Sequence, residues 1–132
     1  MTDQNMHSLA KTYRSRAYAP YSNFLVGAVV KGANGKLYGG CNVENAAYPV
    51  GCCAEASAIS AMVSDGETKI AEILVMAAGK EMISPCGSCR QRIREFADPG
   101  TPVHLATSER VEMTVPFGEL LPYAFGHGHL GD

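Results

Sequence analysis

The chain has 132 residues, 46% of them hydrophobic, and a formal net charge of −2 at pH 7. This length suits one domain that buries about two-thirds of its unfolded surface, so we expect a single domain over residues 1–132. The acidic balance disfavours a nucleic-acid-binding face, and no apolar stretch reaches the roughly eighteen residues of a membrane span. We therefore expect a small-molecule partner, no nucleic acid and no membrane.

Cysteine usage indicates a reducing compartment. The chain has five cysteines, an odd number for a disulfide framework, and its first residues lack the basic flank and apolar core of a secretory signal. We therefore expect a cytoplasmic protein whose thiols stay reduced.

The first third of the chain predicts a helix followed by a hairpin. Apolar residues recur at helical spacing, which predicts an amphipathic helix near residues 3–17. Strand-like segments at 25–30 and 37–43 flank Asn34-Gly35, a strong hairpin signal. We expect these two strands to pair antiparallel.

The rest of the chain alternates between helices and strands. A helix-forming run starts at Cys53 and should end at Gly66, and the apolar run 71–77 predicts a strand buried on both faces. A further helix starts near Cys86 and stops at Pro99. The remaining elements are short, namely strands at 103–106 and 111–114 and a helix at 119–121.

This order of elements predicts the fold class. Strands that alternate with helices form right-handed crossovers, which place helices over a sheet. We expect an α/β fold, a three-layer α/β/α arrangement with a mixed five-stranded sheet. Sites in such sheets lie beyond the strand ends, where the loops before Cys53 and Cys86 would meet.

Three cysteines and one glutamate form the most informative pattern. Glu55 follows Cys53 by two residues, and the motif PCGSC at 85–89 supplies Cys86 and Cys89. Pro85 should lie in the first turn of a helix, and cysteines three apart then share one helix face. Catalytic zinc takes three protein ligands and leaves its fourth position to water. A carboxylate that does not bind the metal can relay protons in a deamination.

Other interpretations of the cysteines stay open from the residues alone. A Cys-x-x-Cys pair is also typical of thioredoxin-like redox sites, and a structural zinc site would need a fourth Cys or His nearby. A zinc module that only binds another protein is a further alternative. Cys52 adjoins Cys53 and cannot easily face the same metal, so we expect Cys52, like Cys41, to be a buried small hydrophobe.

Two helix N-termini at the metal would have an electrostatic effect. Three thiolates around a divalent cation carry a net negative charge, and each helix N-terminus carries roughly half a positive charge. We expect the helix ends to offset part of the negative charge and to lower the pKa values of the thiols.

The sequence resembles the small homotetrameric zinc-dependent cytidine deaminases of pyrimidine salvage over nearly its whole length. Besides the cysteine motifs, the resemblance rests on three blocks: APYSNF at 19–24, GCNVENA at 40–46 and LLPYAF at 120–125. It implies hydrolytic deamination of cytidine and 2'-deoxycytidine to uridine and 2'-deoxyuridine plus ammonia. It also implies one Zn2+ per subunit, held by Cys53, Cys86 and Cys89, with zinc-activated hydroxide attacking C4 and catalytic Glu55 shuttling protons.

The resemblance further implies a set of substrate-binding residues. Phe24 would pack on the pyrimidine, although from the residues alone it could equally be a core side chain. Asn42 and Glu44 would bind the ribose 3'-hydroxyl from one face of the second strand, and Ala54 belongs to the same set. The residues that would complete the site of an adjoining subunit, in an obligate homotetramer, are Ala46, Tyr48 and Phe125.

One departure from the family pattern concerns charge. Many members have an arginine directly after the catalytic glutamate, where this chain has Ala56. The helix ends, Ser57, Arg90 and Gln91 are the candidates to balance the thiolates instead.

Two rival substrates are considered for the same fold and metal. They are a modified aminopyrimidine nucleoside, as in the blasticidin S deaminases, and a polynucleotide, as in editing deaminases. A plain ribose site at Asn42 and Glu44 argues against the first, and the acidic balance argues against the second.

Overall fold

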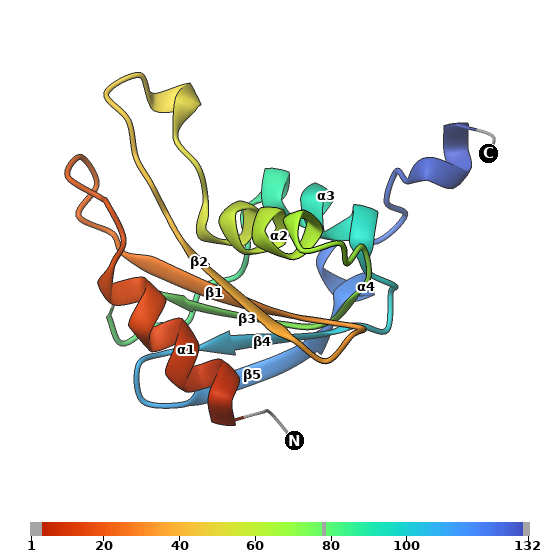
Figure 1. Ribbon diagram of the computed structural model, residues 1–132, viewed down its shortest axis with the longest axis horizontal. Coiled ribbons are helices and arrows are strands. Elements are labelled where there is room, and N and C mark those ends of the chain that lie inside the picture. Colours follow the sequence, from red (N-terminus) through yellow and green to blue (C-terminus); the bar gives the residue numbers. More distant parts are fainter. Residues whose placement is uncertain (1–3, 78, 131–132) are drawn as a thin grey trace.

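The computed structural model describes residues 4–77 and 79–130, in which five strands alternate with helices (Figure 1). Short 3-10 helices are labelled η. The elements in chain order are α1 Gln4–Ser15, β1 Val26–Gly32, β2 Leu37–Cys41, η1 Tyr48–Val50, α2 Ala54–Ser64, β3 Ile70–Ala77, α3 Gly87–Phe96, β4 Pro102–Ala106, β5 Val111–Pro116, α4 Phe117–Leu120 and η2 His127–Leu130.

The strands form one mixed sheet in the order β2-β1-β3-β4-β5. Only the central pair β3 and β4 is parallel among the strands described, and the other neighbours run antiparallel. The hairpin between β1 and β2 turns at Asn34-Gly35, where Gly35 has a φ of +82° and donates its N–H to the Gly32 carbonyl at 2.9 Å. The predicted hairpin is therefore confirmed.

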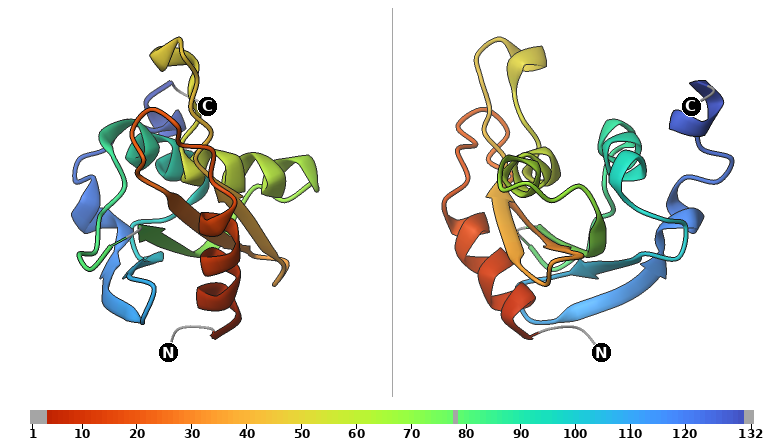
Figure 2. Two further views of the ribbon diagram at one scale, coloured as in Figure 1. Left: turned by 90° about the vertical axis from the view of Figure 1, so that its left-hand side faces the viewer. Right: turned by 45° about the vertical axis from the view of Figure 1, so that its right-hand side comes forward.

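Helices cover both faces of the sheet, as the sequence predicts (Figures 1 and 2). Side chains alternate along a strand, so neighbouring residues of β3 enter different cores. Leu74 packs on the α1 side with Met6, whereas Val75 packs with Met62 of α2 on the opposite side. Both β3 residues are fully buried, which confirms a strand covered on both faces.

α2 lies against β2 because Gly40 leaves room for it. A Cβ added at Gly40 would lie 2.5 Å from the Ala58 nitrogen and 2.8 Å from the Ala54 carbonyl oxygen. Atoms cannot approach so closely, so only glycine allows the first turn of α2 to sit directly on the strand. Gly40 thereby sets the position of Cys53, the residue before the helix.

Some element boundaries differ from the prediction. β2 stops at Cys41 rather than at residue 43, because Val43 leaves the sheet to bridge with Tyr18 and Cys52. Pro85 lies outside α3 rather than in its first turn, and Cys86 is the N-cap. Gly66 follows the end of α2 with a φ of +95°, as expected.

The helices of the described segments are all too short or too polar to cross a membrane.

Candidate metal centre

Two helix N-termini bring the three cysteines of the motif together. Cys53 is the N-cap of α2 and Cys86 is the N-cap of α3, both with extended backbone. The Cys53 carbonyl accepts a hydrogen bond from the Ser57 N–H at 3.1 Å, and the Cys86 carbonyl accepts one from the Arg90 N–H at 2.9 Å. Cys89 lies in the first turn of α3, which brings its side chain to the same gap between the helices.

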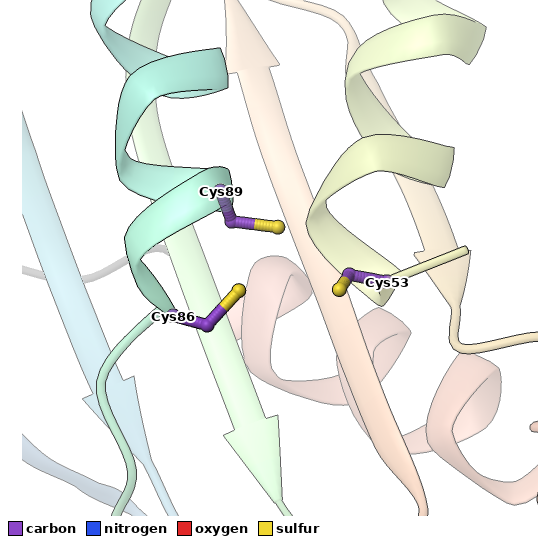
Figure 3. Close-up of side chains that lie close together, drawn as sticks. All are labelled: Cys53, Cys86 and Cys89. Atoms are coloured by element: carbon purple, nitrogen blue, oxygen red, sulfur yellow. The ribbon is translucent and has the colours of Figure 1, made fainter. Parts of the chain in front are cut away.

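The three sulfur atoms point toward one another (Figure 3), and all lie within 4.8 Å of each other. Sulfurs bound to one tetrahedral zinc lie about 3.8 Å apart, given a Zn–S distance of about 2.3 Å. Small side-chain rotations therefore bring Cys53, Cys86 and Cys89 onto one ion. The three thiols are free rather than joined in disulfides, so this donor set fits zinc.

Burial is the largest influence on the acidity of two of the three thiols. Burial raises the pKa values of Cys53 and Cys89, and the charge of the nearby Glu55 carboxylate raises that of Cys89 further. Only the pKa of Cys86 is lowered, chiefly by a hydrogen bond with the Ser88 hydroxyl. The expected lowering is thus wrong for two of the three thiols, because desolvation disfavours the thiolate. A divalent cation supplies the missing counter-charge when it replaces the thiol protons.

Glu55 is the buried carboxylate beside the thiols. It is the second residue of α2 and only 4% exposed. Burial raises its pKa, while the charge of Arg92 acts in the opposite direction. A buried carboxyl group with a raised pKa next to a metal site is suited to accept and release protons during a reaction.

A cleft of about 500 Å³ leads to Cys53. Its size lies in the range of small-molecule sites. Its walls come from the loop before β1 and from the segment between β2 and α2: Tyr21, Ser22, Asn42, Val43, Glu44, Asn45, Tyr48, Gly51, Cys52 and Cys53.

Asn42 anchors the loop before β1. Its Oδ1 accepts a hydrogen bond from the Val26 N–H, and its Nδ2 donates to the Phe24 carbonyl, both at 2.9 Å. One amide proton and one lone pair remain for a ligand in the cleft. Asn42 lies just past the end of β2, so the expected position on a strand face is wrong.

Glu44 anchors the same loop from the segment between β2 and α2. Its Oε1 accepts hydrogen bonds from the N–H groups of Tyr21 at 3.1 Å and Ser22 at 3.0 Å, and its Oε2 accepts one from the Ser22 hydroxyl. The hydrogen bonds from Ser22 lower the pKa of Glu44, so it stays charged. A carboxylate has about four acceptor positions, which leaves one for a ligand.

Comparison with known proteins identifies the family. The family model for the cytidine and deoxycytidylate deaminase zinc-binding region matches residues 1–105. The chain belongs to this family. Its cluster of Cys53, Cys86 and Cys89 is accordingly one zinc site.

Relatives of this deaminase family match most of the chain. A cytidine deaminase from Sporosarcina psychrophila is 41% identical over 116 residues, which are 88% of this chain and 85% of the relative. The crystal structure of cytidine deaminase from Burkholderia pseudomallei has a TM-score of 0.88 and 40% identity, covering 95% of this chain and all of that one. Cytidine deaminase from Mycobacterium tuberculosis has a TM-score of 0.82 and 32% identity, covering 96% of this chain and 99% of that one.

The other residues that the deaminase resemblance singles out lie in different surroundings. Phe24 is 43% exposed, so it is not a core side chain, but it does not line the cleft. Tyr48 lines the cleft and contacts Tyr21 edge to face, with ring centroids 6.0 Å apart. Ala54 is only 1% exposed, at the first position of α2, whereas Ala46 is exposed on the segment before η1.

Phe125 lies on the C-terminal tail and is not among the residues that line the cleft of its own chain. It is 56% exposed, and its carbonyl accepts a hydrogen bond from Gln91 of α3 at 2.9 Å. Both this tail and the segment that carries Tyr48 project beyond the sheet (Figures 1 and 2).

The structure adds residues that sequence reasoning missed. Tyr21 and Ser22 line the cleft and lie in the block APYSNF, where only Phe24 was given a role. Arg92 donates from Nη1 to Ser88 Oγ at 3.2 Å and to Cys89 Sγ at 3.9 Å. The signal for Arg92 was its spacing, since residues three and four apart share a helix face.

The three expected charge-balancing side chains, Ser57, Arg90 and Gln91, are all engaged elsewhere. The Arg90 guanidinium donates to the carbonyls of Pro85 at 2.8 Å and Leu120 at 2.7 Å, and the Gln91 amide donates to the tail. The Ser57 hydroxyl donates to the Cys41 carbonyl at 3.1 Å.

The two remaining cysteines are less buried than expected. Cys41 is half-buried, and Cys52 is exposed with its sulfur beside the Ser57 hydroxyl. Cys52 does not belong to the cluster of Cys53, Cys86 and Cys89.

Proposed function

We propose that the protein is a cytidine deaminase that converts cytidine and 2'-deoxycytidine to uridine and 2'-deoxyuridine plus ammonia, in the salvage of pyrimidine nucleosides. The observation that carries this proposal is a three-thiol zinc site with the buried carboxyl group of Glu55 beside it, at the end of a cleft of nucleoside size. The names of the relatives, which cover most of the chain, support the same activity.

The metal and the carboxylate divide the chemistry. Cys53, Cys86 and Cys89 would hold the zinc ion, which when bound would supply Lewis-acid activation of the water that attacks C4 of the pyrimidine. Glu55 would take a proton from that water and deliver it to ring N3, and would then take the proton of the new C4 hydroxyl and pass it to the amine, which leaves as ammonia. The raised pKa of Glu55 suits both transfers, because a carboxyl group that holds its proton more tightly than usual can both accept and donate it in the reaction.

The cleft wall provides recognition of the sugar. Asn42 and Glu44 each retain hydrogen-bonding capacity after anchoring the loop before β1, and we propose that both bind the ribose 3'-hydroxyl. A site built around such a hydrogen bond rejects an analogue that lacks the hydroxyl, because a buried acceptor is then left without a partner. Phe24, on the anchored loop, would then pack against the pyrimidine.

We further propose a homotetramer with shared active sites. Tyr48 is 74% exposed and Phe125 is 56% exposed, and both lie on segments that project from the body. Exposed aromatic side chains on projecting segments are typical of surfaces that another subunit covers. In this arrangement Ala46, Tyr48 and Phe125 would close the cleft of a neighbour, and assembly would be required for activity.

The decisive experiment measures uridine and ammonia formed from cytidine by zinc-loaded protein. We expect turnover by the wild type and a loss of about 100-fold or more in kcat for Glu55→Gln, since a proton relay contributes about that much. Glu119→Gln, on α4 and exposed, removes the same charge elsewhere and should leave the rate unchanged. A zinc-loaded wild type that forms no uridine at any cytidine concentration would refute the proposal.

A further inference from the structure

Arg92 occupies the groove between α2 and α3, beside the zinc site. Its Nη1 donates to Cys89 Sγ at 3.9 Å and to Ser88 Oγ at 3.2 Å, so the guanidinium faces the first turn of α3. Arg92 therefore contacts one of the metal ligands directly.

The opposite wall of this groove carries Ala56. The groove measures about 540 Å³ and is lined by residues of both helices, including Ala56 and Ile59 from α2 and Arg92 and Phe96 from α3. Ala56 directly follows Glu55 and is 8% exposed. Its methyl group is too small to fill the groove or to carry a charge, which leaves space for a guanidinium that enters from α3.

The charge of the zinc site explains why a cation belongs here. Three thiolates and one divalent ion sum to one negative charge, at a site where Cys89 is fully buried. A buried anion without a counter-charge is costly. Arg90 points its guanidinium at the Pro85 and Leu120 carbonyls, whereas Arg92 directs its own to the sulfur.

We propose that Arg92 is a positioning residue for the zinc centre, which stabilises the thiolates from α3 in a chain whose α2 offers only Ala56 at the groove. It acts through Cys89 rather than through the substrate. Outer hydrogen-bond partners of metal ligands typically contribute about 10- to 100-fold to metal affinity. This inference rests on the zinc site of the proposed function, and on no assumption about the substrate.

The first test is zinc affinity, measured by competition with a chromophoric chelator. Arg92→Gln should weaken zinc binding about tenfold, the lower end of that range because the Arg92 side chain is exposed to solvent. The difference from wild type should shrink as salt is added, because salt screens exposed charges. Lys11→Gln makes the same change in net charge on α1, across the sheet, and should bind zinc like the wild type.

The second test moves the charge across the groove. In an Arg92→Val background, Ala56→Arg should restore most of the lost zinc affinity, because the new guanidinium enters the same groove from α2. Arg92→Lys should retain part of the affinity, since it keeps the charge but loses the planar donor. Thermal unfolding of the metal-free proteins separates these effects from misfolding: Arg92→Gln should unfold at the wild-type temperature before zinc is added.

The outcomes distinguish this inference from the proposed function. A wild type that deaminates cytidine, with zinc affinity unchanged in Arg92→Gln, would overturn the role of Arg92 alone. Reduced affinity without salt dependence and without rescue by Ala56→Arg would overturn it as well. The inference is supported if Arg92→Gln weakens zinc binding, if salt reduces this effect and if Ala56→Arg restores the affinity. This holds even if the wild type turns over no cytidine.

Discussion

The carboxylate of Glu44 is held by Ser22, which donates both its backbone N–H, at 3.0 Å, and its side-chain hydroxyl. Glu44 comes from the segment after β2 and Ser22 from the loop before β1, so this contact joins the two walls of the cleft. A carboxylate fixed by several donors is pre-organised to accept one more hydrogen bond from a ligand.

Removing the Ser22 hydroxyl should weaken substrate binding without disabling the chemistry. For Ser22→Ala we expect the KM for cytidine to rise about two- to tenfold, the effect of one lost hydrogen bond, with little change in kcat. Steady-state kinetics on zinc-loaded protein provide the test. An unchanged KM would mean that the backbone donors of Tyr21 and Ser22 suffice to hold Glu44.

Glu44 should account for discrimination at the 3' position of the sugar. The wild type should prefer cytidine over 3'-deoxycytidine, and Glu44→Ala should reduce that preference about tenfold or more, because a charge-assisted hydrogen bond is lost with cytidine only. The ratio of kcat/KM values for the two nucleosides measures this effect. If Glu44→Ala slows both nucleosides equally, the residue only supports the loop.

Without metal, the Glu55→Gln variant should be more stable than the wild type by a margin that grows as the pH rises. Burial raises the pKa of Glu55 above its unfolded value, so its contribution to stability is complete at low pH and is lost as the pH rises through the folded pKa. Glutamine carries no charge and escapes this loss. Thermal unfolding of both metal-free proteins at pH 5 and pH 8 should show a gap that widens at the higher pH, and a gap of the opposite sign would contradict the prediction.

Zinc binding should release protons and should fail in acid. Cys53 and Cys89 have raised pKa values, so their thiols are protonated in the metal-free protein near neutral pH and must lose those protons to bind zinc. Zinc affinity should therefore fall as the pH is lowered. Calorimetric titrations in buffers with different ionisation enthalpies count the protons, and a heat of binding that is independent of the buffer would contradict this expectation.

Gly40→Ala should displace α2 and weaken the metal site. The new Cβ would overlap the Ala58 nitrogen and the Ala54 carbonyl oxygen, so the helix must move, at a cost of about 1–3 kcal/mol typical of overpacking. Because Cys53 caps that helix, zinc affinity should drop along with stability. Gly100→Ala is the matched control, since a Cβ there meets nothing within 4 Å. Denaturant unfolding and chelator competition should separate the two variants.

Shared active sites can be tested by mixing two inactive variants. Glu55→Gln lacks the proton relay and Phe125→Ala lacks the tail aromatic, so each should be nearly inactive by itself. If Phe125 serves the cleft of a neighbour, dissociating and reassembling the two together should restore activity, because some sites then combine an intact Glu55 with an intact Phe125. A mixture as inactive as its parts would place both residues in the same chain's site.

The parts of this structure that sequence predicts are those fixed by local patterns. The hairpin at Asn34-Gly35, the stop at Gly66 and the buried run of β3 each follow from backbone or burial preferences of neighbouring residues. The convergence of Cys86 and Cys89 also follows from helix geometry.

What sequence could not predict depends on packing between distant segments. The raised pKa of Cys89 follows from its burial, which the sequence alone does not reveal. The side-chain conformations also decide which arginine contacts the Cys89 sulfur: Arg92 donates to it, whereas Arg90 donates to the Leu120 carbonyl. The sequence predicts Asn42 on a strand face, but β2 ends at Cys41. After that point Val43 pairs with Tyr18 rather than with β1.

The link from Gln91 to the Phe125 carbonyl ties the tail to the same helix that supplies Cys86 and Cys89. A shift of α3 on loss of the metal would therefore be passed to the tail, and in the proposed tetramer to the aromatic ring that reaches the neighbouring subunit.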